Sequence, residues 1–207
     1  KEAYLKALVT QTGDAFGLAV AASGDAVVVG APYETCNATG VNEADDNNGA
    51  PSSGAAYVFR RDASGTWDQE AYLKASNTDP GDHFSEEAVS ISGDTVVVGA
   101  CGEDSAATGV NGDQDDNTAV DSGAAYVFQR SGTTWSQQAY LKASNTQGFD
   151  NFGWAVSVSI VQLMGHWVIV GAPNLGGIST GGAAYVFKRS GTIWNPDAFL
   201  QASNSEL

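Results

Sequence analysis

The strongest chemical signal in the sequence is a row of alternating oxygen ligands in an acidic stretch. Asp113, Asp115, Asn117 and Asp121 stand at positions 1, 3, 5 and 9 of one predicted loop. A hard dication such as Ca²⁺ takes about six to eight oxygen ligands, and alternate residues of a tight loop can converge on one point. Thr118 stands at position 6, where a glycine would ease the turn. The stretch predicts a calcium site; the alternative is a solvated polar loop without an ion.

A degraded copy of this pattern lies earlier in the chain. Asp46 and Asn48 stand at positions 3 and 5, followed by Gly49 at position 6. Positions 1 and 9 are Ala44 and Ser52, which offer a weaker ligand set. We expect lower calcium affinity here, or none.

Side chains typical of catalysis are sparse. His83 and His166 are the only histidines, and neither has a motif-spaced partner. Glu86 and Glu87 are neighbours in a predicted strand, so they are expected to point to opposite faces and not to act as a carboxylate pair. No nucleophile elbow, zinc-protease motif or phosphate loop is present. The sequence therefore favours a non-enzymatic protein without an organic cofactor.

Acidic residues also precede each of three similar Phe positions. These are Asp14, Asp79 with Asp82, and Asp150. Short carboxylate side chains often accept hydrogen bonds from nearby backbone amides. We expect these residues to cap turns.

The elements that position these residues come from an internal repeat. The phrase Ala-Tyr-Leu-Lys-Ala starts at residues 3, 71 and 139, and Ala-Phe-Leu-Gln-Ala starts at 198, which gives spacings of 68, 68 and 59. Gly-Ala-Ala-Tyr-Val-Phe starts at residues 54, 123 and 182. The shorter third period lacks residues only between its Gly-Ala-Pro and Gly-Gly-Ala-Ala-Tyr segments. Length variation confined to one connection indicates loops on a repeated scaffold.

Each period predicts four short strands. The first strands are 16–22, 84–91 and 152–161, and the second are β-branched runs such as 27–29, apolar on both faces and hence buried. Residues 55–60 are an example of the third strand, and residues 67–75 are an example of the fourth. The fourth strand alternates apolar with polar residues, as an outer strand does. Four strands per repeat of this length predict an all-β protein of β-propeller blades, since solenoid coils are usually shorter.

The repeats divide the chain into 1–7, the outer strand of a preceding blade, and blades 8–75, 76–143 and 144–207. Closed propellers need about four to eight blades, so three blades do not close a ring. The chain also begins without Met. We therefore expect either part of a longer array or an oligomer that completes a ring or fibre.

Composition narrows the function classes. The chain has 207 residues, 43% hydrophobic residues and a net charge of −15. The hydrophobic content excludes a disordered chain. The negative charge disfavours nucleic acid and anionic membrane surfaces as partners. No apolar run is long enough to span a membrane.

The two cysteines fall at the same end of neighbouring predicted blades. Cys101 follows Gly99-Ala100 directly, and Cys36 lies four residues after Pro32. An inter-blade disulfide in an oxidising compartment and two separate buried thiols are both compatible with this placement.

The repeated motifs resemble the FG-GAP repeat, the blade unit of integrin α-subunit propellers and of many large bacterial surface proteins. Phe16-Gly17 and Phe152-Gly153 match its first motif, and Gly30-Ala31-Pro32 and Gly171-Ala172-Pro173 match its second. The middle repeat departs from both, with Phe84-Ser85 and Gly99-Ala100-Cys101. Its predicted first strand is therefore expected to be distorted or to face a partner or an ion.

The resemblance implies an extracellular or cell-surface module for adhesion to a protein or glycan, stabilised by calcium. The acidic loop is similar to the calcium loops of integrin propellers, although it joins the second and third strands rather than the first and second. Two alternatives are a structural subunit that polymerises into a surface fibre or sheath, with further copies of itself as partners, and an accessory domain of a secreted hydrolase.

Overall fold

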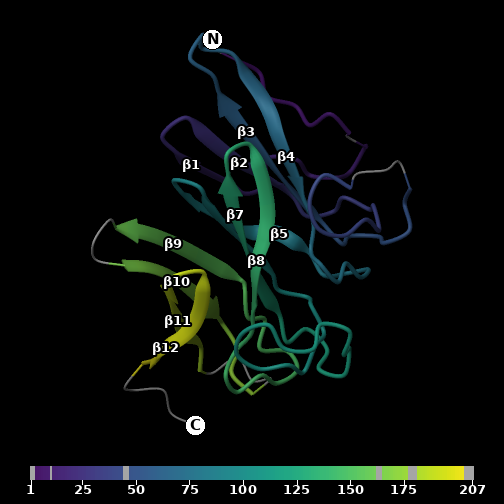
Figure 1. Ribbon diagram of the computed structural model, residues 1–207. Helices are drawn as coiled ribbons and strands as arrows, with labels where there is room; N and C mark the ends of the chain where they lie inside the picture. Colours follow the sequence, from purple (N-terminus) through teal and green to yellow (C-terminus); the bar gives the residue numbers. More distant parts are fainter. Residues whose placement is uncertain (1–2, 10, 44–46, 162–164, 177–180, 203–207) are drawn as a thin grey trace.

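The computed structural model describes residues 3–9, 11–43, 47–161, 165–176 and 181–202. These residues form three antiparallel sheets of four strands and no helix (Figure 1). Sheet 1 contains β1 (Val20–Ser23), β2 (Ala26–Ala31), β3 (Ala55–Arg61) and β4 (Trp67–Leu73). Sheet 2 contains β5 (Phe84–Ser92), β6 (Thr95–Ala100), β7 (Ala124–Ser131) and β8 (Thr134–Leu141). Sheet 3 contains β9 (Ala155–Val161), β10 (Gly165–Ala172), β11 (Ala183–Ser190) and β12 (Ile193–Gln201).

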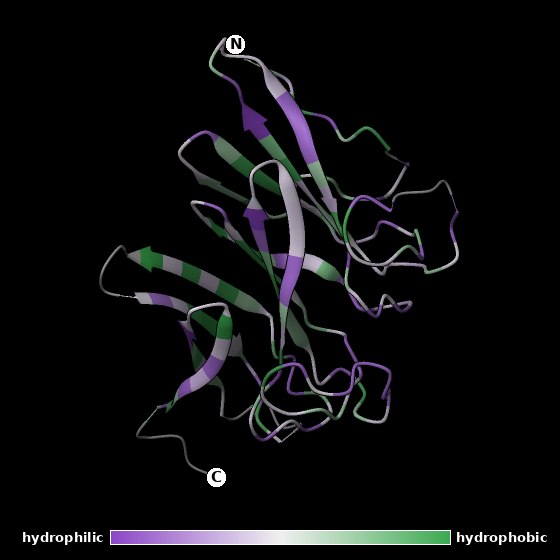
Figure 2. Cartoon of the chain, in the orientation of Figure 1, coloured by the Kyte–Doolittle hydropathy of each residue, from purple (hydrophilic) through white to green (hydrophobic). Residues whose placement is uncertain are grey.

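The all-β fold and its four strands per repeat are confirmed. Strands that follow each other in sequence pair side by side, from an inner first strand to an outer fourth strand. Figure 2 shows hydrophobic residues along β2 and hydrophilic residues along much of the outer strands β4 and β8. The sheets are not closed into a ring (Figure 1).

The first strands of repeats 1 and 3 begin later than predicted. β1 starts at Val20 rather than residue 16, and β9 at Ala155 rather than residue 152. Gly17 and Gly153 have φ values of 98° and 92°, which belong to a turn. The Phe-Gly motif is therefore the turn that leads into the inner strand.

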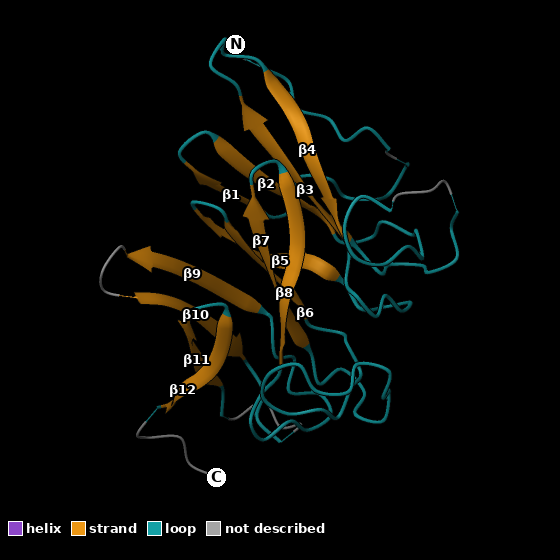
Figure 3. Ribbon diagram, viewed as in Figure 1, coloured by secondary structure: helices purple, strands orange, loops and turns teal. Residues whose placement is uncertain are grey.

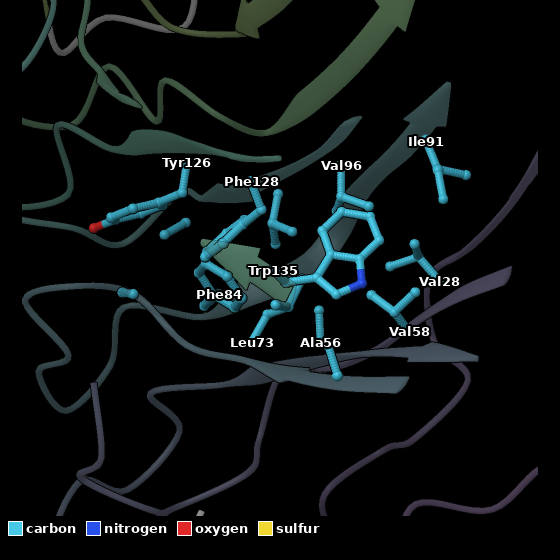
Figure 4. Close-up of a cluster of buried hydrophobic side chains, with 14 of the residues drawn as sticks. Val28, Ala56, Val58, Leu73, Phe84, Ile91, Val96, Tyr126, Phe128 and Trp135 are labelled. Atoms are coloured by element: carbon cyan, nitrogen blue, oxygen red, sulfur yellow. The ribbon is translucent and has the colours of Figure 1, made fainter. Parts of the chain in front are cut away.

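Successive sheets stack face to face around two main cores. Between sheets 1 and 2, Val28, Val58 and Leu73 pack against Phe84 and Trp135, as Figure 4 shows. The junction between sheets 2 and 3 repeats this arrangement with the opposite face of sheet 2, because successive residues of a strand point to opposite faces. The residues of this second core include Val97, Val127, Leu141, Phe152 and Trp194. Sheet 2 is thus the only one of the three covered on both faces by a neighbouring sheet of the described chain.

The junctions also bring two motif backbones together. Phe84 donates its backbone N–H to the Ser53 carbonyl at 2.9 Å, and Phe152 donates to the Ser122 carbonyl at the same distance. The glycine after each serine has no room for a side chain: a Cβ on Gly123 would lie 2.0 Å from the Phe152 carbonyl oxygen. Each Gly-Ala-Ala-Tyr motif therefore contacts the Phe motif of the following repeat.

The N-terminal segment 3–9 lies against sheet 1 without forming a strand. Ala7 is buried with Tyr57 and Tyr72, and the Leu8 N–H donates to the Gln69 side-chain oxygen at 3.0 Å. An outer strand of a preceding blade was predicted here. No strand is assigned among the described residues 3–9, and the membership of residues 1–7 in a preceding blade stays a prediction.

Candidate functional site

The long connections of the repeats gather at one edge of the stack. Residues 32–54 join β2 to β3, and residues 101–123 join β6 to β7 (Figure 3). Each connection touches the outer strand of its own sheet through one isolated bridge, Val41 to Leu73 and Val110 to Leu141. We call this surface, residues 32–43, 47–54 and 101–123, the loop edge.

A buried ion pair anchors each of these two loops. Lys142 Nζ donates to Glu103 Oε2 and to Ser122 Oγ, both at 2.7 Å. Glu103 begins the loop, Ser122 ends it, and Lys142 follows the outer strand, so one ammonium group ties all three segments together. Lys142 and Glu103 are both only 1% exposed. Burial lowers the pKa of Lys142 from its ordinary value despite the attraction of Glu103.

The same set recurs in the first repeat. Lys74 Nζ donates to Glu34 Oε2 at 2.9 Å and to Ser53 Oγ at 2.7 Å. Because the two sets are one period apart, they hold both loops in the same way.

The second set extends into a larger polar network. Glu103 Oε1 accepts hydrogen bonds from the Tyr140 hydroxyl at 2.7 Å and from Asn77 Nδ2 at 3.0 Å. The Tyr126 hydroxyl donates to Asn77 Oδ1 at 2.6 Å. The buried carboxylate thus has partners on both oxygens, which is the condition for a charge to be tolerated away from water.

The third repeat replaces the whole set. Leu175, Gln201 and Gly181 stand where the Glu, Lys and Ser stand in the other repeats. This repeat also has the shortest connection between its second and third strands. Our sequence reasoning missed the set, although its signal was present: a Glu four residues after the glycine of the second motif, together with the Lys of Ala-Tyr-Leu-Lys-Ala.

The predicted calcium ligands share one loop but face different partners. Asp113 Oδ1 accepts the Asp115 N–H at 3.1 Å, and Asn117 Nδ2 donates to Asp79 Oδ2 at 2.9 Å. The Asp121 N–H donates to the Asp104 carboxylate at 2.8 Å. Within the residues that the structure describes, no three His, Cys, Asp or Glu side chains come together in a way that could hold a metal ion. The calcium site at these residues stays a prediction.

The weaker candidate is only partly visible. Asn48 Oδ1 accepts the Thr35 hydroxyl at 2.7 Å, while Asp46 lies outside the described residues.

The acidic residues before the Phe positions act as turn caps. Asp14, Asp82 and Asp150 each accept the backbone N–H of the residue three positions earlier, at 2.6, 2.9 and 2.9 Å. Burial, with Glu103 nearby, raises the pKa of Asp82 to about 7. Asp79 instead uses its side chain to accept from Asn117.

The two cysteines are separate buried thiols in the structure. Cys36 Sγ accepts the Ala38 N–H at 3.3 Å, and Cys101 Sγ donates to Glu86 Oε2 at 3.4 Å. Burial, followed by the negative charge of Glu86, raises the pKa of Cys101 to about 12. Of the two arrangements considered, the structure contains the two separate buried thiols.

Glu86 and Glu87, predicted to point to opposite faces of a strand, lie in an irregular part of β5. Both line one small recess, together with His83, Cys101 and Trp154. The pairing of β5 with β6 shifts register between Phe84 and Val89, so strict alternation does not hold across these residues. The expected distortion of the middle repeat is therefore present. His166 lies elsewhere, on β10, where its Nδ1 is 3.4 Å from Arg189 Nη1.

Comparison with known proteins agrees with the repeat geometry. The sequence profile of the FG-GAP repeat matches residues 1–59, 67–128 and 135–187. A search of curated proteins found no match. In the described residues, no helix is long and apolar enough to cross a membrane.

Proposed function

Because this chain belongs to the FG-GAP repeat family, we propose that it is a non-enzymatic interaction module that binds a protein or glycan at a cell surface or outside the cell. Repeats of this family form β-propeller modules that are typically non-catalytic and typical of extracellular or surface proteins. The loop edge is the surface that we assign to recognition.

The observation that supports this proposal is the anchoring of the two long loops. Buried ion pairs of Lys74 and Lys142 hold the ends of the two loops, while residues in the middle of each loop remain exposed. Loops presented on a rigid base of this kind commonly carry binding function. The edge is rich in carboxylates, including Asp104, Asp113, Asp115, Asp116 and Asp121. We therefore propose that calcium binds at Asp113, Asp115, Asn117 and Asp121 and contributes to ligand binding.

The test is binding of the full chain to a printed glycan array and to a panel of purified extracellular-matrix proteins, in millimolar calcium and in EDTA. We expect a retained ligand whose affinity falls at least about tenfold in EDTA. The double variant Asp113→Ala/Asp115→Ala should lose the calcium dependence, because it removes two of the oxygen ligands.

The matched control is Asp68→Ala at an exposed position of β4, outside the loop edge. It should keep the calcium dependence. Failure to retain any glycan or matrix protein would contradict the recognition role. Binding that is equal in calcium and EDTA would overturn the calcium proposal alone.

A further inference from the structure

The last sheet of the stack exposes a face that the other sheets bury. We call the face of a sheet that packs on the following sheet its trailing face. On sheet 3 this face contains Ile169 and Leu200, which are 43% and 52% exposed. The equivalent residues of sheets 1 and 2 are all 0% exposed: Val28, Leu73, Val97 and Leu141.

The first sheet is incomplete on its opposite, leading face. Phe16 and Trp67 are only half-buried there. Their equivalents, which contact a preceding sheet, are buried: Phe84, Phe152, Trp135 and Trp194. Sheets 1 and 3 lie at opposite ends of the stack, on either side of sheet 2, so the two faces do not meet within the described chain (Figure 1).

The junction between sheets 1 and 2 shows what chemistry covers such faces. Glu70 of sheet 1 accepts the Trp135 indole N–H at 3.0 Å and lies 2.6 Å from Arg130 Nη2 of sheet 2. Arg60 of sheet 1 lies 3.4 Å from Asp94 of sheet 2. This junction thus contains two cations, two anions and one indole donor.

The two ends of the chain carry the same chemical set. On the trailing face of sheet 3, Lys188 and Asp197 stand at the repeat positions of Arg60 and Glu70. On the leading face of sheet 1, the positions of Arg130 and Trp135 are taken by Arg61 and Trp67, whereas Asp25, at the position of Asp94, already pairs with Arg60 at 2.6 Å.

The junction between sheets 2 and 3 is chemically different. There Gln129 and Gln138 are the acceptors, for Arg189 at 2.9 Å and Trp194 at 2.8 Å. The charge complementarity of the ends is therefore not a property that every junction shares.

We propose that a second copy of this chain covers the trailing face of sheet 3 with the leading face of its sheet 1. In this contact, Arg61 and Trp67 of one copy bind Asp197 of the other, as Arg130 and Trp135 bind Glu70. The backbone of the incoming Phe16 meets Gly182, which carries no side chain to obstruct it. Because the two surfaces differ, the contact is head-to-tail and builds a ring or a filament. This inference does not depend on recognition at the loop edge.

Segment 3–9 regulates this contact. Ala7 contacts sheet 1 as Ala75 contacts sheet 2, so the segment occupies the place of a preceding outer strand. In the proposed contact, residues 198–202 of a second copy would occupy the position that segment 3–9 takes against sheet 1. Association therefore competes with the segment, and a variant that loosens it, Ala7→Asp, should associate more strongly than the unmodified chain.

Sedimentation velocity of the full chain over a concentration series tests the proposal. The unmodified chain should form larger species as its concentration rises. Arg61→Glu and Asp197→Lys should each weaken association at least about tenfold, because each places like charges opposite one another. An equimolar mixture of the two variants should restore assembly. In the mixture, the carboxylate introduced in one variant meets the ammonium group introduced in the other, and the native pair of Arg61 with Asp197 forms at the alternate contact.

Glu43→Lys is the matched control: it reverses an exposed charge on the loop edge and should leave association unchanged. All three charge variants should retain the circular dichroism spectrum of the unmodified chain. The proposal is overturned if the unmodified chain and Ala7→Asp both remain monomeric up to about 1 mM, a concentration that detects even weak contacts. It is also overturned if the mixture assembles no better than the separate variants.

Discussion

The variant Lys142→Met is expected to lose about 3–5 kcal/mol of unfolding free energy, because it leaves a buried carboxylate without its cation. Glu103 is 1% exposed, and its Oε2 lies 2.7 Å from Lys142 Nζ. Methionine fills a similar volume, so the loss comes from charge rather than from a cavity. Urea unfolding followed by tryptophan fluorescence measures the change.

The double variant Glu103→Leu/Lys142→Met is the informative comparison. It removes both charges and should be more stable than Lys142→Met, although the Tyr140 hydroxyl and Asn77 lose an acceptor. Gln201→Met, at the same repeat position in sheet 3, is the control and should change stability by about 0.5 kcal/mol or less. A Lys142→Met variant as stable as the unmodified chain would show that the ion pair does not anchor the loop.

The variant Gly99→Ala is expected to lose about 2–4 kcal/mol of unfolding free energy, because a methyl group there collides with the next sheet. Its Cβ would lie 1.9 Å from the Gly153 carbonyl oxygen and 2.8 Å from the Ala88 Cβ. The obstacle is backbone, which cannot rotate away as a side chain can. Differential scanning calorimetry should show a lower melting temperature.

Gly171→Ala provides the matched control, since Gly171 holds the same position in sheet 3. Its Cβ would have the Ala155 Cβ as its nearest neighbour, at an ordinary 3.6 Å. We expect this variant to differ from the unmodified chain by about 0.5 kcal/mol or less. Equal losses in the two variants would mean that the glycine serves the conformation of its own strand and not the junction.

Much of the architecture could be predicted from repeated local patterns. The β-branched runs ending in Gly-Ala indicated buried strands, and β2 and β6 occupy those positions. The turns at Gly24 and Gly93 join antiparallel partners as expected. These features depend on residues close in sequence, so periodicity and turn chemistry were sufficient.

The features that sequence reasoning missed depend on distant or irregular contacts. Lys142 and Glu103 are 39 residues apart, and charged residues are ordinarily expected at the surface. β5 shifts register against β6 between Phe84 and Val89, an irregularity around Glu86 and Glu87 that alternation does not foresee. In the acidic loop, the Asp113 carboxylate accepts the Asp115 N–H and the Asn117 amide donates to Asp79, contacts that the spacing alone does not indicate.

Amide hydrogen exchange of the dilute, monomeric chain, followed by mass spectrometry, tests the stacked arrangement most directly. Neighbouring sheets cover both faces of sheet 2, whereas sheet 3 has an exposed trailing face. Backbone amides in β6 and β7 should therefore exchange most slowly, and those in the equivalent interior strands β10 and β11 distinctly faster. Protection in β10 and β11 equal to that in β6 and β7 would contradict an open stack in which sheet 3 is the uncovered end.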